Sequence, residues 1–197
     1  MKTVLLLKSS LFNGSGQSSQ LANEFVAKAF PGAQLIERDL ARHPVPHLDG
    51  ERFSAFLSKQ DSRDEKQASI VAYSDALIDE LRRADAIVIG LPMYNFGLPS
   101  QLKAWIDHIA RAGETFRYAA SGPLGLMTGK KAYIFATRGG KYAGTPADTQ
   151  TPYLRDFLAF IGITDVEFVY AEGLAIGDAA RSAGLSAARQ KMESLVQ

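Results

Sequence analysis

Residues 86–100 read AIVIGLPMYNFGLPS, an apolar run that passes through an aromatic-rich loop into a helical pattern. The first part, Ala86–Leu91, is apolar without alternation, which is typical of a parallel strand covered on both faces. Pro99 then opens a pattern that ends before Gly113, and a helix prefers proline in its first turn and glycine after its last. The stretch therefore predicts a strand–loop–helix unit of an α/β fold.

The rest of the chain repeats this alternation. Four more apolar or β-branched runs are predicted to be strands: Thr3–Lys8, Gln34–Asp39, Ala132–Thr137 and Val166–Tyr170. Helices are predicted at Ser18–Phe30, Glu65–Arg83, Pro99–Ala112, Thr151–Gly162 and Ala179–Val196, with Thr151 as an N-cap followed by Pro152 at the first helical position. Five strands alternating with helices in 197 residues predict one doubly wound α/β sheet.

Composition limits the possible functions. With 46% hydrophobic and 22% charged residues, the chain can bury a core as a single domain, 1–197. A net charge of +1 argues against nucleic acid and anionic membranes as partners. Apolar runs are too short for a membrane helix or a signal peptide, which predicts a cytoplasmic protein. The absence of cysteine excludes disulfides and thiolate metal sites.

Histidines give no metal-binding pattern. His43, His47 and His108 lack the spacing of metal ligands, so no metal site is predicted. His108 and Arg111 are expected on a solvated helix face, and the irregular segment 41–60 is expected to contain a short helix near Glu51–Leu57.

Three loops are predicted to form the ligand site, because ligands of such sheets bind beyond the carboxyl ends of the strands. The first loop, Ser9–Gln17, places hydroxyls and two glycines at a helix N-terminus, and it carries no lysine or arginine. Neutral donors and the helix dipole suit a tightly held phosphate. The alternative is a loop whose serines and glycines only cap the helix.

The second and third loops suit a flat ring. Residues 92–98 expose large apolar side chains at a strand-to-helix turn, which fits an isoalloxazine ring unless Met93 and Phe96 turn inward to complete the core. In the loop Arg138–Gln150, the adjacent Gly139 and Gly140 allow close approach of backbone N–H groups to the pyrimidine edge of such a ring. A plain turn is the alternative there.

Two nucleotide motifs fail on spacing. Gly14-Ser15-Gly16 begins a dinucleotide fingerprint but lacks its third glycine, and Gly125 to Lys130 departs from a phosphate-binding loop of nucleotide hydrolases in both spacing and the strand that follows. A dehydrogenase that uses Gly14 and Gly16, with Asp39 on a ribose, remains an alternative and would purify without a yellow cofactor.

Taken together, the loops resemble those of the FMN-dependent NADH-azoreductase family of flavodoxin-like NAD(P)H:quinone oxidoreductases. The similarity covers nearly the whole chain and includes these motifs in order: the opening Lys8-Ser9-Ser10, residues 92–103, 110–113, 115–118, 138–140, 151–154 and 160–163. It implies a flavodoxin-like sheet of five parallel strands in the order 2-1-3-4-5 with helices on both faces. It further implies one bound FMN per subunit and a homodimer with active sites at the interface.

The resemblance also assigns cofactor contacts. These are Ser10, Gly16, Gln17 and Ser18 for the phosphate, Met93, Tyr94, Asn95 and Phe96 for the ring, and Thr137, Arg138, Gly139 and Gly140 for its pyrimidine side. Members often have serine where this chain has Gly16, so only a backbone contact is expected there, and Ser15 is a candidate for the missing hydroxyl. Thr137 replaces a common serine and keeps the hydroxyl.

The implied reaction is a ping-pong two-electron transfer. NADH or NADPH passes a hydride to the flavin and leaves, and a quinone or azo compound then receives the electrons at the same place. No catalytic acid or base is expected. Phe116 and Tyr118, on a flexible-looking stretch 114–126, and Phe160, from the partner subunit, are candidate substrate contacts. The alternative function is a flavodoxin-type electron carrier, although such carriers are usually strongly acidic.

Overall fold

The computed structural model describes residues 1–196 and contains a parallel sheet at its centre. The strands are β1 (Thr3–Lys8), β2 (Gln34–Asp39), β3 (Ala86–Pro92), β6 (Lys131–Thr137) and β7 (Asp165–Ala171). They lie in the order β2-β1-β3-β6-β7, and every neighbouring pair is parallel. Among these five strands that is the predicted order 2-1-3-4-5, so the flavodoxin-like fold class is confirmed.

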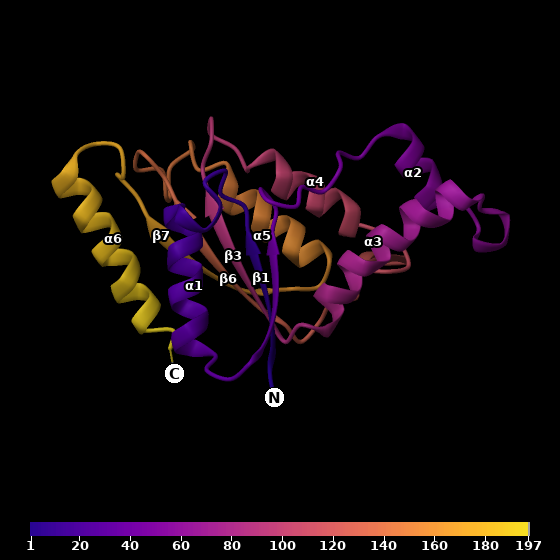
Figure 1. The fold of residues 1–197 in the computed structure, drawn as a ribbon, viewed down its shortest axis with the longest axis horizontal. Helices are drawn as coiled ribbons and strands as arrows, with labels where there is room; N and C mark the ends of the chain where they lie inside the picture. The colour runs from indigo at the N-terminus through magenta and orange to yellow at the C-terminus, as the bar shows by residue number, and fades with distance from the viewer. Residues whose placement is uncertain (197) are drawn as a thin grey trace.

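Helices cover both faces of the sheet (Figure 1). One face carries α1 (Gln17–Ala29) and α6 (Asp178–Glu193), and the other carries α3 (Glu65–Arg83), α4 (Ser100–Ile109) and α5 (Gln150–Phe160). Each face has its own apolar core, because the central strands send buried side chains to both sides. This packing fixes the strand ends, whose carboxyl edge lies at the top of Figure 1.

Helix α5 begins before the predicted cap. Its first residue is Gln150, so Thr151 lies within the helix and Pro152 occupies the third helical position. Asp148 takes the capping role instead, because its carboxylate accepts hydrogen bonds from the Thr151 backbone N–H at 3.1 Å and from the Thr151 hydroxyl at 2.7 Å. The predicted N-cap at Thr151 is therefore wrong.

The stretch 114–126, which looked flexible from its sequence, forms an antiparallel hairpin of β4 (Phe116–Ala119) and β5 (Gly122–Gly125). It packs closely on the end of α5, where a side chain at Gly125 would overlap the backbone of Gly162. Phe116 is buried and its ring lies 4.3 Å from the ring of Phe160. The hairpin is thus anchored by its base.

Segment 41–60 contains the predicted short helix, α2 (Gly50–Leu57), and it packs on α3. Short 3₁₀ turns also occur at Asn13–Ser15 and Gln60–Ser62. Phe56 of α2 lies edge-on to the His108 ring of α4, and the guanidinium of Arg111, which follows α4, lies 5.1 Å from the centre of the Phe56 ring. His108 is only 1% exposed and Arg111 is buried, so the solvated face expected for them is wrong.

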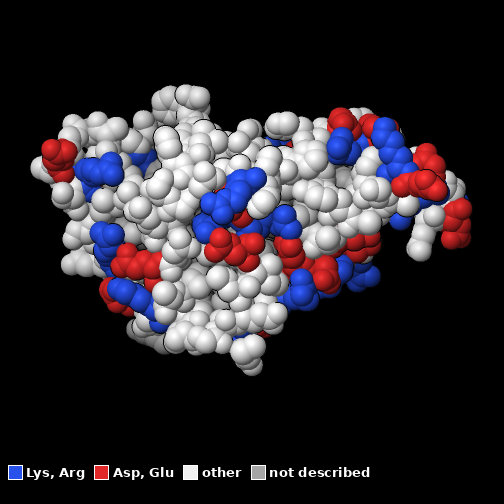
Figure 2. Space-filling model, viewed as in Figure 1, with Lys and Arg blue, Asp and Glu red and all other residues white. Residues whose placement is uncertain are grey.

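Charges of both signs lie close together on the face that Figure 2 shows. On the face shown, lysines and arginines lie beside aspartates and glutamates without a continuous patch of one sign. Within residues 1–196, no helix has the length and apolar character required to cross a membrane.

Candidate functional site

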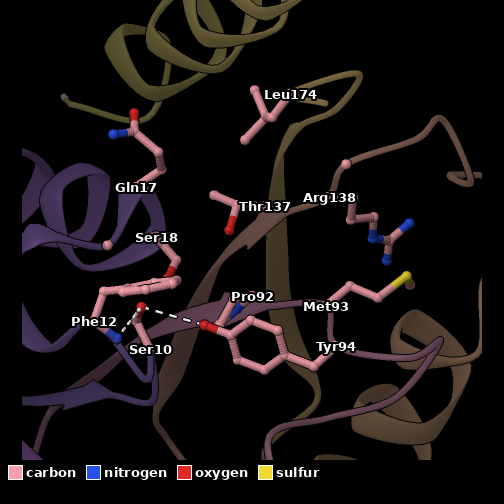
Figure 3. Close-up of a pocket in the computed structure, with 12 residues that line it drawn as sticks. Ser10, Phe12, Gln17, Ser18, Pro92, Met93, Tyr94, Thr137, Arg138 and Leu174 are labelled. Carbon is pink, nitrogen blue, oxygen red and sulfur yellow. Dashed lines mark hydrogen bonds between the residues drawn. The ribbon is translucent and has the colours of Figure 1, made fainter. Parts of the chain in front are cut away.

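The carboxyl ends of β1, β3 and β6 bring the three predicted loops together around one pocket of about 250 Å³ (Figure 3). Its walls are Ser10, Phe12, Gly16, Gln17, Ser18, Pro92, Met93, Tyr94, Thr137, Arg138, Gly139 and Leu174. Nine of these twelve residues are among the predicted cofactor contacts. The other three predicted contacts, Asn95, Phe96 and Gly140, are not part of the lining and belong to the same loops.

Three lining residues were not predicted. Phe12 and Pro92 lie inside loops that the sequence marked as ligand-binding, but neither has a polar group that suggests a contact. Leu174 follows β7, a strand end that the three-loop prediction did not include. The position of β7 beside β6 in the sheet brings Leu174 to the pocket, and that neighbour relation is the signal that could have identified it.

The first loop ends at the N-terminus of α1 and leaves hydrogen-bond donors unused. Gly16 is the N-cap of α1 and has no side chain to accept from the first N–H groups of the helix. The Ser18 hydroxyl is buried and has no partner among the described residues, although it belongs to a side chain that lines the pocket. Such groups, with the positive end of the helix dipole, form a site for an anion held without a cationic side chain.

The Ser10 and Tyr94 side chains link the first loop to the second. The Ser10 hydroxyl accepts from the Phe12 N–H at 3.2 Å and lies 3.5 Å from the Tyr94 hydroxyl, as Figure 3 shows. The same Tyr94 oxygen accepts from the Leu11 N–H at 3.2 Å. Tyr94 therefore fixes the distance between the phosphate-type loop and the aromatic loop.

The aromatic loop makes a tight turn in an unusual backbone conformation. Tyr94 and Gly97 exchange two backbone hydrogen bonds, and the residues between them have φ values of +48° at Asn95 and +62° at Phe96. Two successive left-handed residues define a type I′ turn, which normally takes Asn-Gly because a side chain at the second position is strained. Phe96 is 57% exposed, so it does not complete the core.

The third loop is held by a buried ion cluster. The Arg138 guanidinium donates to Asp148 at 2.7 Å, to Glu172 at 3.2 Å and to Thr151 at 3.2 Å. Burial raises the pKa of Asp148, but hydrogen bonds from Arg138 and Thr151 outweigh it and hold that pKa below its ordinary value. All of the charge on Arg138 is therefore engaged by protein groups.

The ion cluster leaves the Arg138 side chain unable to make the ligand contact that was expected of it. Its side chain lies across the pocket from Gln17 in Figure 3, and its guanidinium is wholly buried in the ion cluster. Glu172 extends the cluster, because one of its oxygens also accepts from the N–H groups of Tyr142 and Ala143. The guanidinium thus supports the third loop through Asp148 and Glu172 and is not free to contact a ligand.

The candidate substrate aromatics do not line this pocket in the described part of the chain. Phe116 and Phe160 pack on each other, and Tyr118 stands at the hairpin with 77% of its surface exposed. Tyr118 lies edge-on to Phe116, with 5.6 Å between ring centres. The three rings therefore form an aromatic cluster, Phe160–Phe116–Tyr118, that ends in an exposed tyrosine.

Comparisons with known proteins agree with the motifs. The family described as having a flavodoxin-like fold matches residues 1–196. A protein of Alcanivorax borkumensis named FMN-dependent NADH:quinone oxidoreductase is 53% identical over 192 residues, which cover 96% of this chain and 97% of that protein. A protein of Burkholderia lata named FMN-dependent NADH:quinone oxidoreductase 6 is 54% identical and covers 96% and 98%, respectively.

Solved structures agree as well. The crystal structure of an azoreductase from Bacillus anthracis strain Sterne superposes with a TM-score of 0.89 at 27% identity, covering 100% of this chain and 99% of its own. The resemblance inferred from the loop motifs is confirmed. This chain belongs to the flavodoxin-like family of FMN-dependent NADH:quinone oxidoreductases.

Proposed function

We propose that this protein binds FMN in the pocket at the sheet edge and uses it to carry two electrons from NADH to quinones. The observation that carries the proposal is the pocket itself, which joins an uncharged anion cradle around Ser18 to an aromatic turn at Tyr94–Gly97. Relatives more than half identical to this chain, over nearly its whole length, bear the name of that activity. We also propose that the whole chain, 1–197, forms a single FMN-binding domain.

The residues fit the two ends of FMN. The phosphate end offers hydrogen-bond donors from Ser10, Gln17, Ser18 and the free N–H groups of α1. The Ser18 hydroxyl has no partner among the described residues, and a bound phosphate would supply the missing acceptor. At the ring end, the loops 93–96 and 137–140 offer apolar surface and backbone N–H groups. Arg138 contributes here through its backbone and through the cluster that supports the loop.

Chemistry at this site belongs to the cofactor, since bound FMN supplies the acceptor and donor of the hydride. The lining contains no carboxylate or histidine, and its one cation, Arg138, is neutralised by Asp148 and Glu172. The protein's part is therefore to orient the ring and to aim the Gly139 and Gly140 N–H groups at the pyrimidine edge, where negative charge develops on reduction.

Donor and acceptor use one place in turn, in a ping-pong order with two-electron transfer. The exposed turn around Phe96 borders an open pocket, so a planar molecule can reach the ring from solvent. Azo compounds have the same planar, electron-accepting character as quinones, and a structural neighbour is an azoreductase. Initial rates with NADH and quinone both varied should give parallel lines in double-reciprocal plots, whereas intersecting lines would contradict this order.

The aromatic cluster Phe160–Phe116–Tyr118 serves the active site of a partner subunit in a homodimer. Tyr118 is exposed, and Leu124 and Leu126 on the same hairpin are exposed apolar side chains that a second copy would cover. Tyr118→Ala should raise KM for bulky acceptors and leave FMN content unchanged. Sedimentation that gives a monomer at micromolar concentration would contradict the dimer.

A titration with matched variants tests the FMN site. Ser18 and Ser19 are both buried with unpartnered hydroxyls, but only Ser18 lines the pocket. Ser18→Ala should weaken FMN binding about tenfold, the effect of one lost hydrogen bond to a charged group, and Ser19→Ala should not. Riboflavin, which lacks the phosphate, should bind both variants like the wild type. Equal FMN affinity in the two variants would contradict the assignment.

A further inference from the structure

We propose that Gln150 is a positioning residue that sets the spacing between the two loops on either side of the flavin ring. The inference rests on the proposed FMN site and adds a residue that lies outside the pocket lining. Gln150 is the last residue of the predicted third loop and the first residue of α5, and its surface is 0% exposed. Its carboxamide lies between the turn at Tyr94–Gly97 and the Arg138 cluster.

Every strong hydrogen-bonding atom of the Gln150 side chain is used on these loops. Its Nε2 donates to the Pro92 carbonyl at 3.0 Å and to the Gly97 carbonyl at 3.0 Å. Its Oε1 accepts from the Arg138 Nε–H at 3.3 Å. Pro92 and Gly97 flank the predicted ring contacts 93–96, so one side chain holds both ends of that segment.

The segment needs such support because its backbone is strained. Asn95 and Phe96 both adopt left-handed conformations, which asparagine tolerates but which a bulky residue such as Phe96 keeps only where neighbouring groups impose it. The Thr149 hydroxyl donates to the Phe96 carbonyl, and the Phe96 ring packs edge-on to Tyr142. All of these supports come from the third loop and the start of α5.

The other end of the link is rigid. Arg138 is fixed by Asp148 and Glu172, and Glu172 also accepts from the N–H groups of Tyr142 and Ala143. A displacement of the Gln150 carboxamide would therefore move the strained turn relative to the third loop. An apolar side chain of equal size would fill the volume but leave the Gly97 and Pro92 carbonyls without this donor.

Two substitutions separate positioning from packing. Gln150→Met keeps the length of the side chain and removes all three hydrogen bonds. Gln150→Glu keeps an acceptor for Arg138 and removes the amide donor to the turn. Ser74→Ala is the matched control, because Ser74 is equally buried, donates to the His108 carbonyl at 2.6 Å and accepts from Arg111 at 3.0 Å, far along the chain from the pocket loops.

The experiment measures the melting temperature of each apoprotein and its dissociation constants for FMN and riboflavin. We expect all three variants to melt at lower temperature, but only the Gln150 variants to bind flavin more weakly, by about tenfold. The loss should be the same for FMN and riboflavin, because Gln150 acts on the ring loops and not on the phosphate. The visible absorption maxima of bound FMN should also shift.

Flavin affinities within about twofold of the wild type in both Gln150 variants would overturn the inference, even if melting temperatures fall, because Gln150 would then only stabilise the fold. A weakening confined to FMN would overturn it as well, since that places the effect at the phosphate end. A wild-type protein that binds neither flavin would instead contradict the proposed function itself. The three failures are therefore distinguishable.

Discussion

The Ser10 side chain occupies the space that a side chain at Gly16 would need. A β-carbon built on Gly16 would overlap the Ser10 hydroxyl and lie 2.5 Å from the Ser10 Cβ, closer than real atoms approach. Glycine at this helix cap and serine in the loop after β1 are therefore a coupled pair. The Ser10 hydroxyl therefore fills the place beside Gly16. Ser15, the residue expected to supply a missing hydroxyl, is not part of the pocket lining, and its hydroxyl donates to the Phe12 carbonyl at 2.7 Å.

This pair predicts a result for exchanging the two residues. Gly16→Ser should weaken FMN binding about tenfold or more, because either Ser10 or the start of α1 must move. Adding Ser10→Gly should restore much of the affinity, since the hydroxyl is then supplied from the other side of the same space. Fluorescence titration of the single and double variants checks this. A double variant as weak as Gly16→Ser alone would show that the two positions act independently.

The strained turn predicts opposite results for two replacements of Phe96. Phe96→Asn should keep the turn, because asparagine tolerates the left-handed conformation, and should leave FMN affinity near the wild type while KM for quinone rises. Phe96→Val should destabilise the protein by about 1 kcal/mol relative to the asparagine variant, because a β-branched residue is strained there. Denaturant unfolding and steady-state kinetics measure the two effects. Equal stability of the variants would contradict the role of backbone strain.

The Arg138 cluster predicts a large effect on stability. Arg138→Met leaves Asp148 and Glu172 without their partner and should lower the free energy of unfolding by about 3 kcal/mol, as expected when a buried ion pair is broken. Arg189→Met is the control, since the Arg189–Glu24 pair is partly exposed and should contribute less than about 1 kcal/mol. Urea unfolding of both variants provides the comparison. Similar losses would show that the cluster is no stronger than a surface pair.

His108 predicts a loss of stability in mild acid. Burial lowers the pKa of His108 below its ordinary 6.5, and nearby Arg52 adds to this effect against the opposing Ala104 carbonyl, Asp107 and Asp49. The unfolded chain therefore binds a proton at His108 more readily than the folded chain. The contribution of neutral His108 to the free energy of unfolding is present above pH 6.5 and is lost as the pH falls below that value.

The test compares the free energies of unfolding at about pH 7.5 and about pH 5.5, which lie on either side of the ordinary histidine pKa. His108→Asn keeps a donor for the Ala104 carbonyl, 3.0 Å from the histidine Nδ1, and should lose less stability between the two values than the wild type. His43→Asn, at an exposed histidine, should behave like the wild type. An unchanged pH dependence in His108→Asn would contradict the prediction.

The strands could be predicted from local runs of apolar and β-branched residues, and the site loops from the topology of a parallel sheet. β1 and β2 have the predicted bounds, β3 and β6 are longer by one residue at one end, and β7 is longer by one residue at each end. The loops followed from topology, because every parallel strand ends at the same edge. Side-chain direction did not follow in the same way: Arg138 was expected at the ligand, and its guanidinium turns to partners that are distant in sequence.

Other differences also depend on tertiary contacts. The β4–β5 hairpin has strands of four residues with glycines and a proline, too short and irregular for a strand pattern, and it is stabilised by its packing on α5. His108 and Arg111 have the polarity of surface residues, but α2 covers them through Phe56. No periodicity within one helix predicts which distant segment will cover its polar side.

FMN bound in this pocket is expected to pass electrons from NADH to quinones, and one spectroscopic experiment decides whether it does. The purified protein is mixed with FMN without oxygen, and the visible spectrum is recorded alone, after NADH and then after a quinone. We expect a flavin spectrum perturbed by the protein, bleaching by NADH and recovery of the oxidised spectrum with quinone. Flavin that does not bind, or bound flavin that NADH leaves oxidised, would contradict this expectation.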